Sequence, residues 1–172
     1  MGDTSAHFLL LCGETVGALA ALGVREDERE LIAPNPEWIA DAAFVDDAVS
    51  YGVFSAGEAV GLLSLIDPRL IADEDDGRDR FQSDCLYLWR LMVDRRHRGR
   101  GYGRAAIEFA ARYAALTGLA GVSLTTMDRI PGNALALYRA LGFEPTGRRL
   151  DDEIELVRRH ELAPRARHGA RP

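Results

Sequence analysis

The sequence has 172 residues, which suits one domain, and its 47% hydrophobic residues are enough to build a buried core. No apolar run reaches the roughly 18 residues that a membrane-spanning helix needs, and the N-terminal MGDTSAHFLLLC does not resemble a signal peptide. The two cysteines, Cys12 and Cys85, are far apart and lack metal-ligand spacing. We therefore expect buried thiols in a reducing compartment, no metal site and a cytoplasmic protein that does not bind membranes.

The charge is distributed unevenly along the chain. Residues 1–85 carry 5 arginines and 18 acidic residues, a net charge of −13, whereas residues 86–172 carry 16 arginines and 9 acidic residues, a net charge of +7. All 21 basic residues are arginine. This asymmetry would favour a cationic ligand at the first half and a polyanion at the second, although a diffuse solvated surface would produce the same pattern.

The first half of the sequence predicts a strand, two helices and a hairpin. The hairpin turns at Ala56-Gly57, between two strand-like apolar runs. In chain order the predicted elements are a strand at 7–12, helices at 14–22 and 36–45, and strands at 48–55 and 58–66. Residues 67–84 are polar and acidic and predict a long exposed loop, a type of segment that is often functional.

The second half begins with a continuous apolar run at 85–93, which is typical of a central strand. Residues 105–116 have apolar side chains at helical spacing and predict an amphipathic helix. A strand at 121–127, a short helix at 134–141 and strands at 143–149 and 153–162 follow. The order βααββ followed by βαβαββ predicts a mixed α/β fold, with one domain over 1–162 and a flexible tail at 163–172.

A turn rich in arginine and glycine, RRHRGRGYGR at 95–104, joins the central strand to the following helix. Glycines at 99, 101 and 103 let backbone N–H groups approach a ligand closely. The first turn of a helix adds unpaired N–H groups and a partial positive charge. The arrangement predicts an anion site, and phosphate is the usual ligand of such a site.

Several known phosphate and nucleic-acid motifs do not match this turn. The dinucleotide pattern G-x-G-x-x-G would need glycine where Arg104 stands, and the Walker pattern needs a lysine, which the sequence lacks. An RNA-binding arginine/glycine segment is normally longer and repeated, and its stacking candidates here, Tyr87 and Trp89, lie in a strand expected to be buried. We therefore expect no nucleic-acid partner; a plain charged turn remains an alternative.

The remaining pattern is Arg98-x-x-Gly101-x-Gly103, preceded by an apolar strand and followed by a helix and by LYRALGF further on. Over roughly residues 48–160 this resembles the GNAT superfamily of acetyl-CoA-dependent N-acetyltransferases. The resemblance implies the GNAT fold, with acetyl-CoA as cosubstrate. It implies that Leu91, Met92 and Val93 pair with pantetheine at a splayed strand and provide an oxyanion-stabilising N–H group. The implied pyrophosphate contacts are the backbone amides of Arg98, Gly99, Arg100, Gly101, Tyr102, Gly103 and Arg104.

The same resemblance implies that Tyr138 is the general acid that protonates the coenzyme A thiolate. A tyrosine, with a reference pKa of about 10, is a plausible donor to a thiolate whose acid has a pKa of about 8.5. Packing of Tyr138 against Phe143 is the alternative. The family's cofactor-binding asparagine stands seven residues before the tyrosine, where this chain has Pro131; Asn133 is a cofactor candidate whose alternative role is a helix N-cap.

An amine acceptor must lose a proton before it attacks, and a carboxylate could accept it. Asp94, after the central strand, and Glu153, at the start of the last strand, are the candidates; surface or salt-bridged carboxylates are the alternative for both. No histidine and cysteine cluster suggests a metal ion.

Three segments resemble bacterial polyamine acetyltransferases: LIAPNPEWIADA, WRLMVDRRHRGRGYGRAAIE and GFEPTGRRLDDEIELV, in which Glu153 or Glu155 matches a glutamate of that group. This resemblance implies a polyamine or similar small primary amine as acceptor, and a homodimer. The acidic run at 73–79 would line its approach. An aminoglycoside-like amine, a peptide amine and a non-catalytic acetyl-CoA sensor are the alternatives.

Overall fold

The computed structural model describes residues 5–29, 31–45, 48–71 and 82–160. Within these ranges the strands form one seven-stranded sheet in the order β1-β2-β3-β4-β5-β7-β6. All neighbouring strands are antiparallel except β4 and β5, which are parallel. The strands are β1 His7–Leu10, β2 Ala48–Ser55, β3 Glu58–Ile66, β4 Cys85–Val93, β5 Gly121–Met127, β6 Glu144–Leu150 and β7 Glu153–Arg159.

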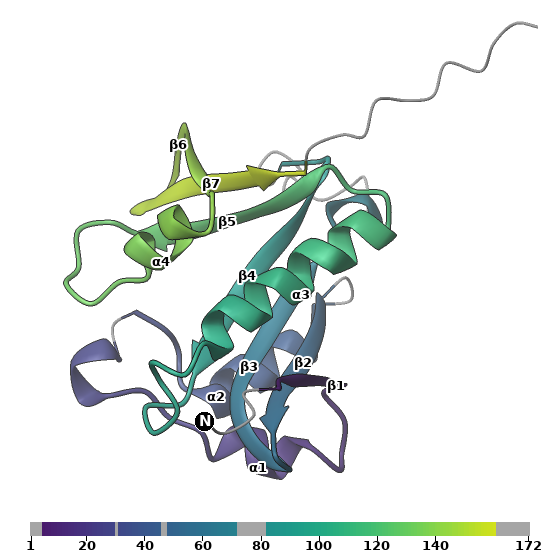
Figure 1. The fold of residues 1–172 in the computed structure, drawn as a ribbon, viewed down its shortest axis with the longest axis vertical. Helices are drawn as coiled ribbons and strands as arrows, with labels where there is room; N and C mark the ends of the chain where they lie inside the picture. Colours follow the sequence, from purple (N-terminus) through teal and green to yellow (C-terminus); the bar gives the residue numbers. More distant parts are fainter. Residues whose placement is uncertain (1–4, 30, 46–47, 72–81, 161–172) are drawn as a thin grey trace, which may run out of the picture.

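Helices cover both faces of the sheet (Figure 1). They are α1 Val16–Ala20, α2 Asn35–Ala42, α3 Tyr102–Leu116 and α4 Leu135–Ala140, with two short 3₁₀ helices, η1 Glu26–Glu28 and η2 Pro68–Leu70. Alternate residues of a strand point to opposite faces, so neighbouring leucines of β3 enter different cores. Leu63 packs with α3 and α4 in one core, and Leu62 packs with Leu19 of α1 and Trp38 of α2 in the other.

The predicted mixed α/β fold and the order of its elements are confirmed. The helix predicted from the periodicity of 105–116 is present as α3 and begins slightly earlier, at Tyr102. Gly101 precedes it with φ of 87° and accepts a hydrogen bond from Ala105 N–H, so the turn passes directly into the helix. The predicted tail at 163–172 and the centre of the acidic loop, 72–81, lie outside the described residues. In the described part of the chain, no helix combines the length and apolarity needed to cross a bilayer.

The parallel pair β4 and β5 separates along its length. Pairing is limited to Cys85 with Gly121, Leu86 with Val122 and Tyr87 with Ser123, although β4 continues to Val93 and β5 to Met127. Figure 1 shows the two strands close together at one end and apart at the other. On its other edge β4 remains paired with β3 up to Val93, with a register shift opposite Ser64. The splay expected from the resemblance is therefore present, and it opens the sheet beside β4.

Candidate active site

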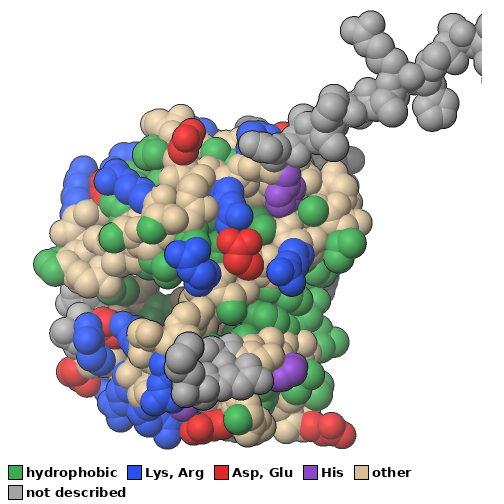
Figure 2. Space-filling view, viewed as in Figure 1, with side chains coloured by type: hydrophobic (Ala, Val, Ile, Leu, Met, Phe, Trp, Pro, Cys, Tyr) green, Lys and Arg blue, Asp and Glu red, His purple; other side chains and the backbone are tan. Residues whose placement is uncertain are grey.

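A cavity of about 680 Å³ occupies the opening between β4 and β5. Its walls are the β4 residues from Tyr87 to Val93, the β5 residues from Thr125 to Met127, the glycine turn with the start of α3, and parts of the segments 24–33 and 132–138. Figure 2 shows a hollow on this face, with arginine side chains above and below it. The sheet splay thus brings together residues from both halves of the sequence.

The glycine turn forms one end of this cavity. Gly99 and Gly101 have φ of 73° and 87°, a conformation that side chains with a β-carbon rarely adopt. No described atom lies within 4 Å of a β-carbon built at either position, so the space beside the backbone is open. The first turn of α3, a helix of 15 residues, follows directly. Exposed backbone at a helix N-terminus suits an anionic group such as a phosphate.

The predicted cofactor residues largely meet at this cavity. Leu91, Met92 and Val93 line it from β4, beyond the point where pairing with β5 ends. Of the turn residues, Arg98, Gly99, Gly101, Tyr102, Gly103 and Arg104 line the cavity, and Arg100 is not among the lining residues. Tyr102 is nevertheless buried, in a small core with Val53 and Val60. The structure therefore brings the backbone of the turn to the cavity while some of its side chains serve the fold.

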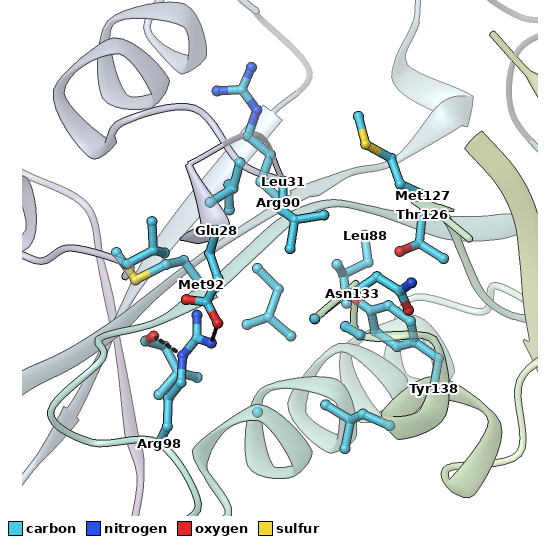
Figure 3. A pocket seen from close by; sticks show the side chains of 18 of the residues that line it. Glu28, Leu31, Leu88, Arg90, Met92, Arg98, Thr126, Met127, Asn133 and Tyr138 are labelled. Carbon is cyan, nitrogen blue, oxygen red and sulfur yellow. Dashed lines mark hydrogen bonds and ion pairs between the residues drawn. The ribbon is translucent and has the colours of Figure 1, made fainter. Parts of the chain in front are cut away.

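A buried glutamate that the sequence analysis missed holds the side chain of Arg98. Glu28 of η1 is 2% exposed and lines the cavity. It forms an ion pair with Arg98 and another with Arg25, whose Nη2 lies 2.8 Å from Glu28 Oε1. Arg98 also donates to the carbonyl of Val93, at 3.3 Å. These contacts tie the N-terminal segment to the glycine turn (Figure 3).

Tyr138 reaches the cavity from α4 and is buried. Its burial, followed by the negative charge of Glu153 and an interaction with Tyr87, raises the pKa of Tyr138 to about 12. The ring also packs edge-on against Phe143, with centroids 5.7 Å apart. Tyr138 therefore both packs against Phe143 and lines the cavity. With this raised pKa the phenol is protonated at neutral pH.

Asn133 lies beside Tyr138 in the cavity wall (Figure 3). Its side-chain oxygen accepts from Leu135 N–H at 3.0 Å, and its Nδ2 donates to the carbonyl of Ile130 at 2.6 Å. The N-cap of α4 is Ala134, so the predicted N-cap role of Asn133 is wrong; its two bonds instead brace the turn just before the helix. Asn133 therefore serves the helix that carries Tyr138.

The two carboxylates considered as bases occupy different environments. Glu153 lines the cavity and accepts a hydrogen bond from the hydroxyl of Thr125 on β5. Asp94 does not line the cavity; it accepts from the backbone N–H groups of Gly23 and Arg96 and from Arg96 Nε, each at 2.9 Å. Burial alone would raise the pKa of Asp94, but these hydrogen bonds outweigh it and lower the pKa to about 2.

Glu155, the other glutamate matched to the polyamine acetyltransferases, is buried away from the cavity lining. It accepts from Gln82 Nε2 at 2.8 Å and from Thr146 Oγ1 at 2.6 Å, and Arg148 lies 3.5 Å away. Its contacts link β7 to β6 and to the end of the acidic loop. Glu153 is thus the member of the pair that reaches the cavity.

A model described as the acetyltransferase (GNAT) family matches residues 13–143. This chain belongs to the acetyltransferase (GNAT) family. The match includes the glycine turn and ends at Phe143, the residue against which Tyr138 packs. The GNAT membership expected from the sequence is confirmed; the closeness to polyamine acetyltransferases is not.

Curated relatives of this GNAT chain match it in part. N-acetyltransferase family 8 member 3 of Rattus norvegicus is 34% identical over 96 residues, which are 54% of this chain and 37% of the relative. An uncharacterized N-acetyltransferase of Shouchella clausii is 29% identical over 129 residues, which are 73% of this chain and 64% of the relative. This chain therefore spans little more than a third of the length of the rat relative and less than two thirds of the bacterial one.

Solved structures of GNAT proteins share the fold. The PaiA N-acetyltransferase of Thermoplasma acidophilum, in complex with coenzyme A, superimposes with a TM-score of 0.65 at 13% identity and covers 91% of this chain and 99% of its own. The GNAT domain of PAT from S. lividans reaches a TM-score of 0.68 at 15% identity and covers 90% of each chain. At such identities the likeness shows the fold alone. The described ranges contain no group of three or more His, Cys, Asp and Glu side chains that could hold a metal ion. Of the two thiols expected to be buried, Cys85 is buried, whereas Cys12 is exposed, so the expectation is wrong for Cys12.

Proposed function

We propose that this protein transfers the acetyl group of acetyl-CoA to a primary amine. The observation that carries the proposal is the convergence of three features on one cavity: the opening between β4 and β5, the glycine turn at the start of α3, and the pair Tyr138 and Glu153. Family membership supports the same activity.

The cavity fits acetyl-CoA by the chemistry of its walls. Open space beside Gly99 and Gly101 gives the pyrophosphate access to backbone N–H groups, and the N-terminus of α3 favours its negative charge. The edge of β4 that faces β5 is unpaired beyond Tyr87, so Leu91, Met92 and Val93 offer backbone groups to the pantetheine amides. Acetyl-CoA supplies an activated acyl group as a thioester.

The side chains of the cavity suit direct attack by the amine. Glu153 takes the proton of the acceptor ammonium, and the free amine then forms a bond to the acetyl carbon. An N–H group of β4 stabilises the negative charge that develops on the carbonyl oxygen. When the carbon–sulfur bond breaks, Tyr138 gives its proton to the departing thiolate. Asp94 is not part of this scheme, because its oxygens are engaged by Gly23 and Arg96.

A polyamine or similar small amine is the proposed acceptor. A glutamate in the cavity and the acidic first half of the chain support a cationic acceptor. The acidic run 73–79, expected to line its approach, lies outside the described residues. We also propose a cytoplasmic location, which rests on the sequence, and a homodimer, which rests on the resemblance to polyamine acetyltransferases.

The test is a thiol-release assay with acetyl-CoA and a panel of amines, combined with a direct binding measurement for acetyl-CoA. The panel contains spermidine, spermine, an aminoglycoside, a peptide with a free N-terminus and a simple monoamine. Turnover highest with spermidine or spermine is the expected result. Acetyl-CoA binding without turnover of any amine would instead make the protein a sensor, and turnover confined to the aminoglycoside or peptide would replace the polyamine.

A further inference from the structure

Three side chains form a hydrogen-bonded chain across the inner end of the opening between β4 and β5. The oxygens of Tyr87 on β4 and Thr125 on β5 are 2.9 Å apart, and Thr125 donates to Glu153 Oε2 on β7. Tyr87 and Ser123 form the last backbone pair between β4 and β5, so the chain begins where that pairing ends. All three side chains line the cavity.

The direction of the hydrogen bonds follows from the number of protons available. An ionised carboxylate can only accept, and a threonine hydroxyl has one proton. Because that proton goes to Glu153, the Tyr87 hydroxyl must donate to Thr125. Glu153 Oε2 is thereby occupied, and among the described residues no hydrogen bond or ion pair engages Oε1. Oε1 is thus the oxygen left to take a proton from an acceptor.

We propose that Thr125 is a positioning residue that orients Glu153 for proton uptake, and that Tyr87 fixes Thr125 for this task. The proposal rests on the proposed function, in which Glu153 takes the ammonium proton. A hydroxyl donor stabilises the charged carboxylate and restricts its rotation, so that Oε1 faces the acceptor. The acceptor N–H bond breaks, its proton passes to Oε1, and the electron pair stays on nitrogen for attack on the acetyl carbon.

Among the described residues of the neighbouring elements, the groups that pair with or act on this carboxylate are uncharged. Tyr138 of α4 interacts with it electrostatically. The residues paired with Glu153 on β5 and β6 are Met127 and Leu150, which carry no charge. Arg149 of β6 is engaged by Asp128 and by the carbonyl of Asp152. Thr125 is therefore the donor whose removal should affect the position of the Glu153 carboxylate most directly.

The experiment compares T125V, which keeps the shape but removes the hydroxyl, with T125S, which keeps the hydroxyl. Loss of a hydrogen bond to a charged group predicts a decrease in kcat of about 10- to 100-fold at neutral pH for T125V. The decrease should appear in kcat rather than in the KM of the amine, because the carboxylate is still present but is no longer held in place by the Thr125 hydroxyl. The Kd of acetyl-CoA should not change, and T125S should restore most of the turnover.

Two results would overturn the positioning role: equal losses in T125V and T125S, which indicate packing, or a loss in T125V that appears in the KM of the amine rather than in kcat. Thermal unfolding checks that T125V is folded. If it is not, Tyr87→Phe serves as the second variant. A smaller decrease in kcat is expected for it, because the loss of the Tyr87 hydroxyl weakens the hydrogen bond from Thr125 to Glu153 without removing it.

A readout independent of turnover separates this proposal from the proposed function. In protein with ¹³C-labelled glutamate carboxyls, the signal of Glu153 is identified by its loss in E153Q and compared by NMR between the variants at one pH. A changed chemical shift of the Glu153 carboxyl in T125V, restored in T125S, supports the Thr125 interaction even if no amine is acetylated, a result that would overturn the acetyl transfer alone. Turnover of an amine with an unchanged chemical shift would overturn the role of Thr125 and leave the acetyl transfer standing.

Discussion

Tyr138 on α4 and Glu153 on β7 line the same cavity, and the charge of the glutamate acts on the phenol. Burial is the larger cause of the raised pKa of Tyr138, about 12, and the negative charge of Glu153 is the next. When Glu153 takes a proton from the acceptor, that second contribution disappears. The proposed acid therefore becomes stronger after the proposed base has acted, which is the order that acetyl transfer requires.

This coupling predicts that Glu153→Gln lowers the pKa of Tyr138 from about 12. The value should stay above the ordinary one, because burial, the larger cause, is unchanged. Spectrophotometric titration of the phenols measures it, and the difference from Glu153→Gln combined with Tyr138→Phe isolates the signal of Tyr138. An unchanged pKa in Glu153→Gln would show that the two groups do not communicate.

Tyr138→Phe tests the proton donor itself. We expect turnover to fall by about 10²- to 10³-fold, within the range of general acid catalysis, while the Kd of acetyl-CoA changes little. The ring that packs 5.7 Å from Phe143 remains, so the fold should be retained. Tyr113→Phe is the control, because Tyr113 of α3 contacts Phe109 and is not among the cavity-lining residues. Equal turnover of the two variants would argue against the donor role.

The parts of the site that sequence predicts well are those fixed by neighbours in the chain. The glycine turn could be interpreted as an anion site because an apolar strand precedes it and a helix follows it within ten residues. Tyr138 could be placed near Phe143 because Gly142 lies between them. These relations join residues that are close together in the chain, so they do not depend on long-range contacts.

The parts that sequence could not predict depend on long-range contacts. Glu28 and Arg98 are 70 residues apart, and the contact exists because η1 packs beside the glycine turn. The side chains of Tyr87, Thr125 and Glu153 meet through the register of three strands, which no spacing along the chain reveals. Likewise Asp94 directly follows β4 in sequence, yet its carboxylate accepts a hydrogen bond from Gly23, 71 residues earlier, and Asp94 does not line the cavity.

A third prediction concerns Gly101 and the binding of acetyl-CoA. Gly101→Val should abolish measurable acetyl-CoA binding, because a side chain would fill the open space beside the turn and disfavour φ of 87°. Gly118→Val is a matched control: Gly118 has φ of 77° and open space around it, but it lies at the end of α3 and does not line the cavity.

Both variants carry similar backbone strain, so both should lose thermal stability. Only Gly101→Val should lose its affinity for acetyl-CoA, as measured by calorimetric titration. Comparable loss of affinity in Gly118→Val would mean that strain alone, rather than blocked access to the backbone, explains the result.

Asp94 is expected to matter for stability and not for turnover. Its pKa is about 2 in the folded protein against the ordinary 3.8, because the hydrogen bonds from Arg96 and Gly23 outweigh burial. A group whose folded pKa is depressed contributes stability above the unfolded value and loses it as pH falls through the folded value. A shift of this size corresponds to roughly 2 kcal/mol. Asp94→Asn should therefore lower the free energy of unfolding at neutral pH by about that amount.

Chemical denaturation at several pH values measures this effect, and the difference from the unmodified protein should shrink as pH falls from 3.8 towards 2. Asp128→Asn is the control, since its ion pair with Arg149 is more exposed and should contribute less. The Asp94→Asn variant also tests which of the two carboxylates, Asp94 or Glu153, is the base. Folded Asp94→Asn should keep its turnover whereas Glu153→Gln loses it, because of these two carboxylates only Glu153 lines the cavity. The opposite result would make Asp94 the base.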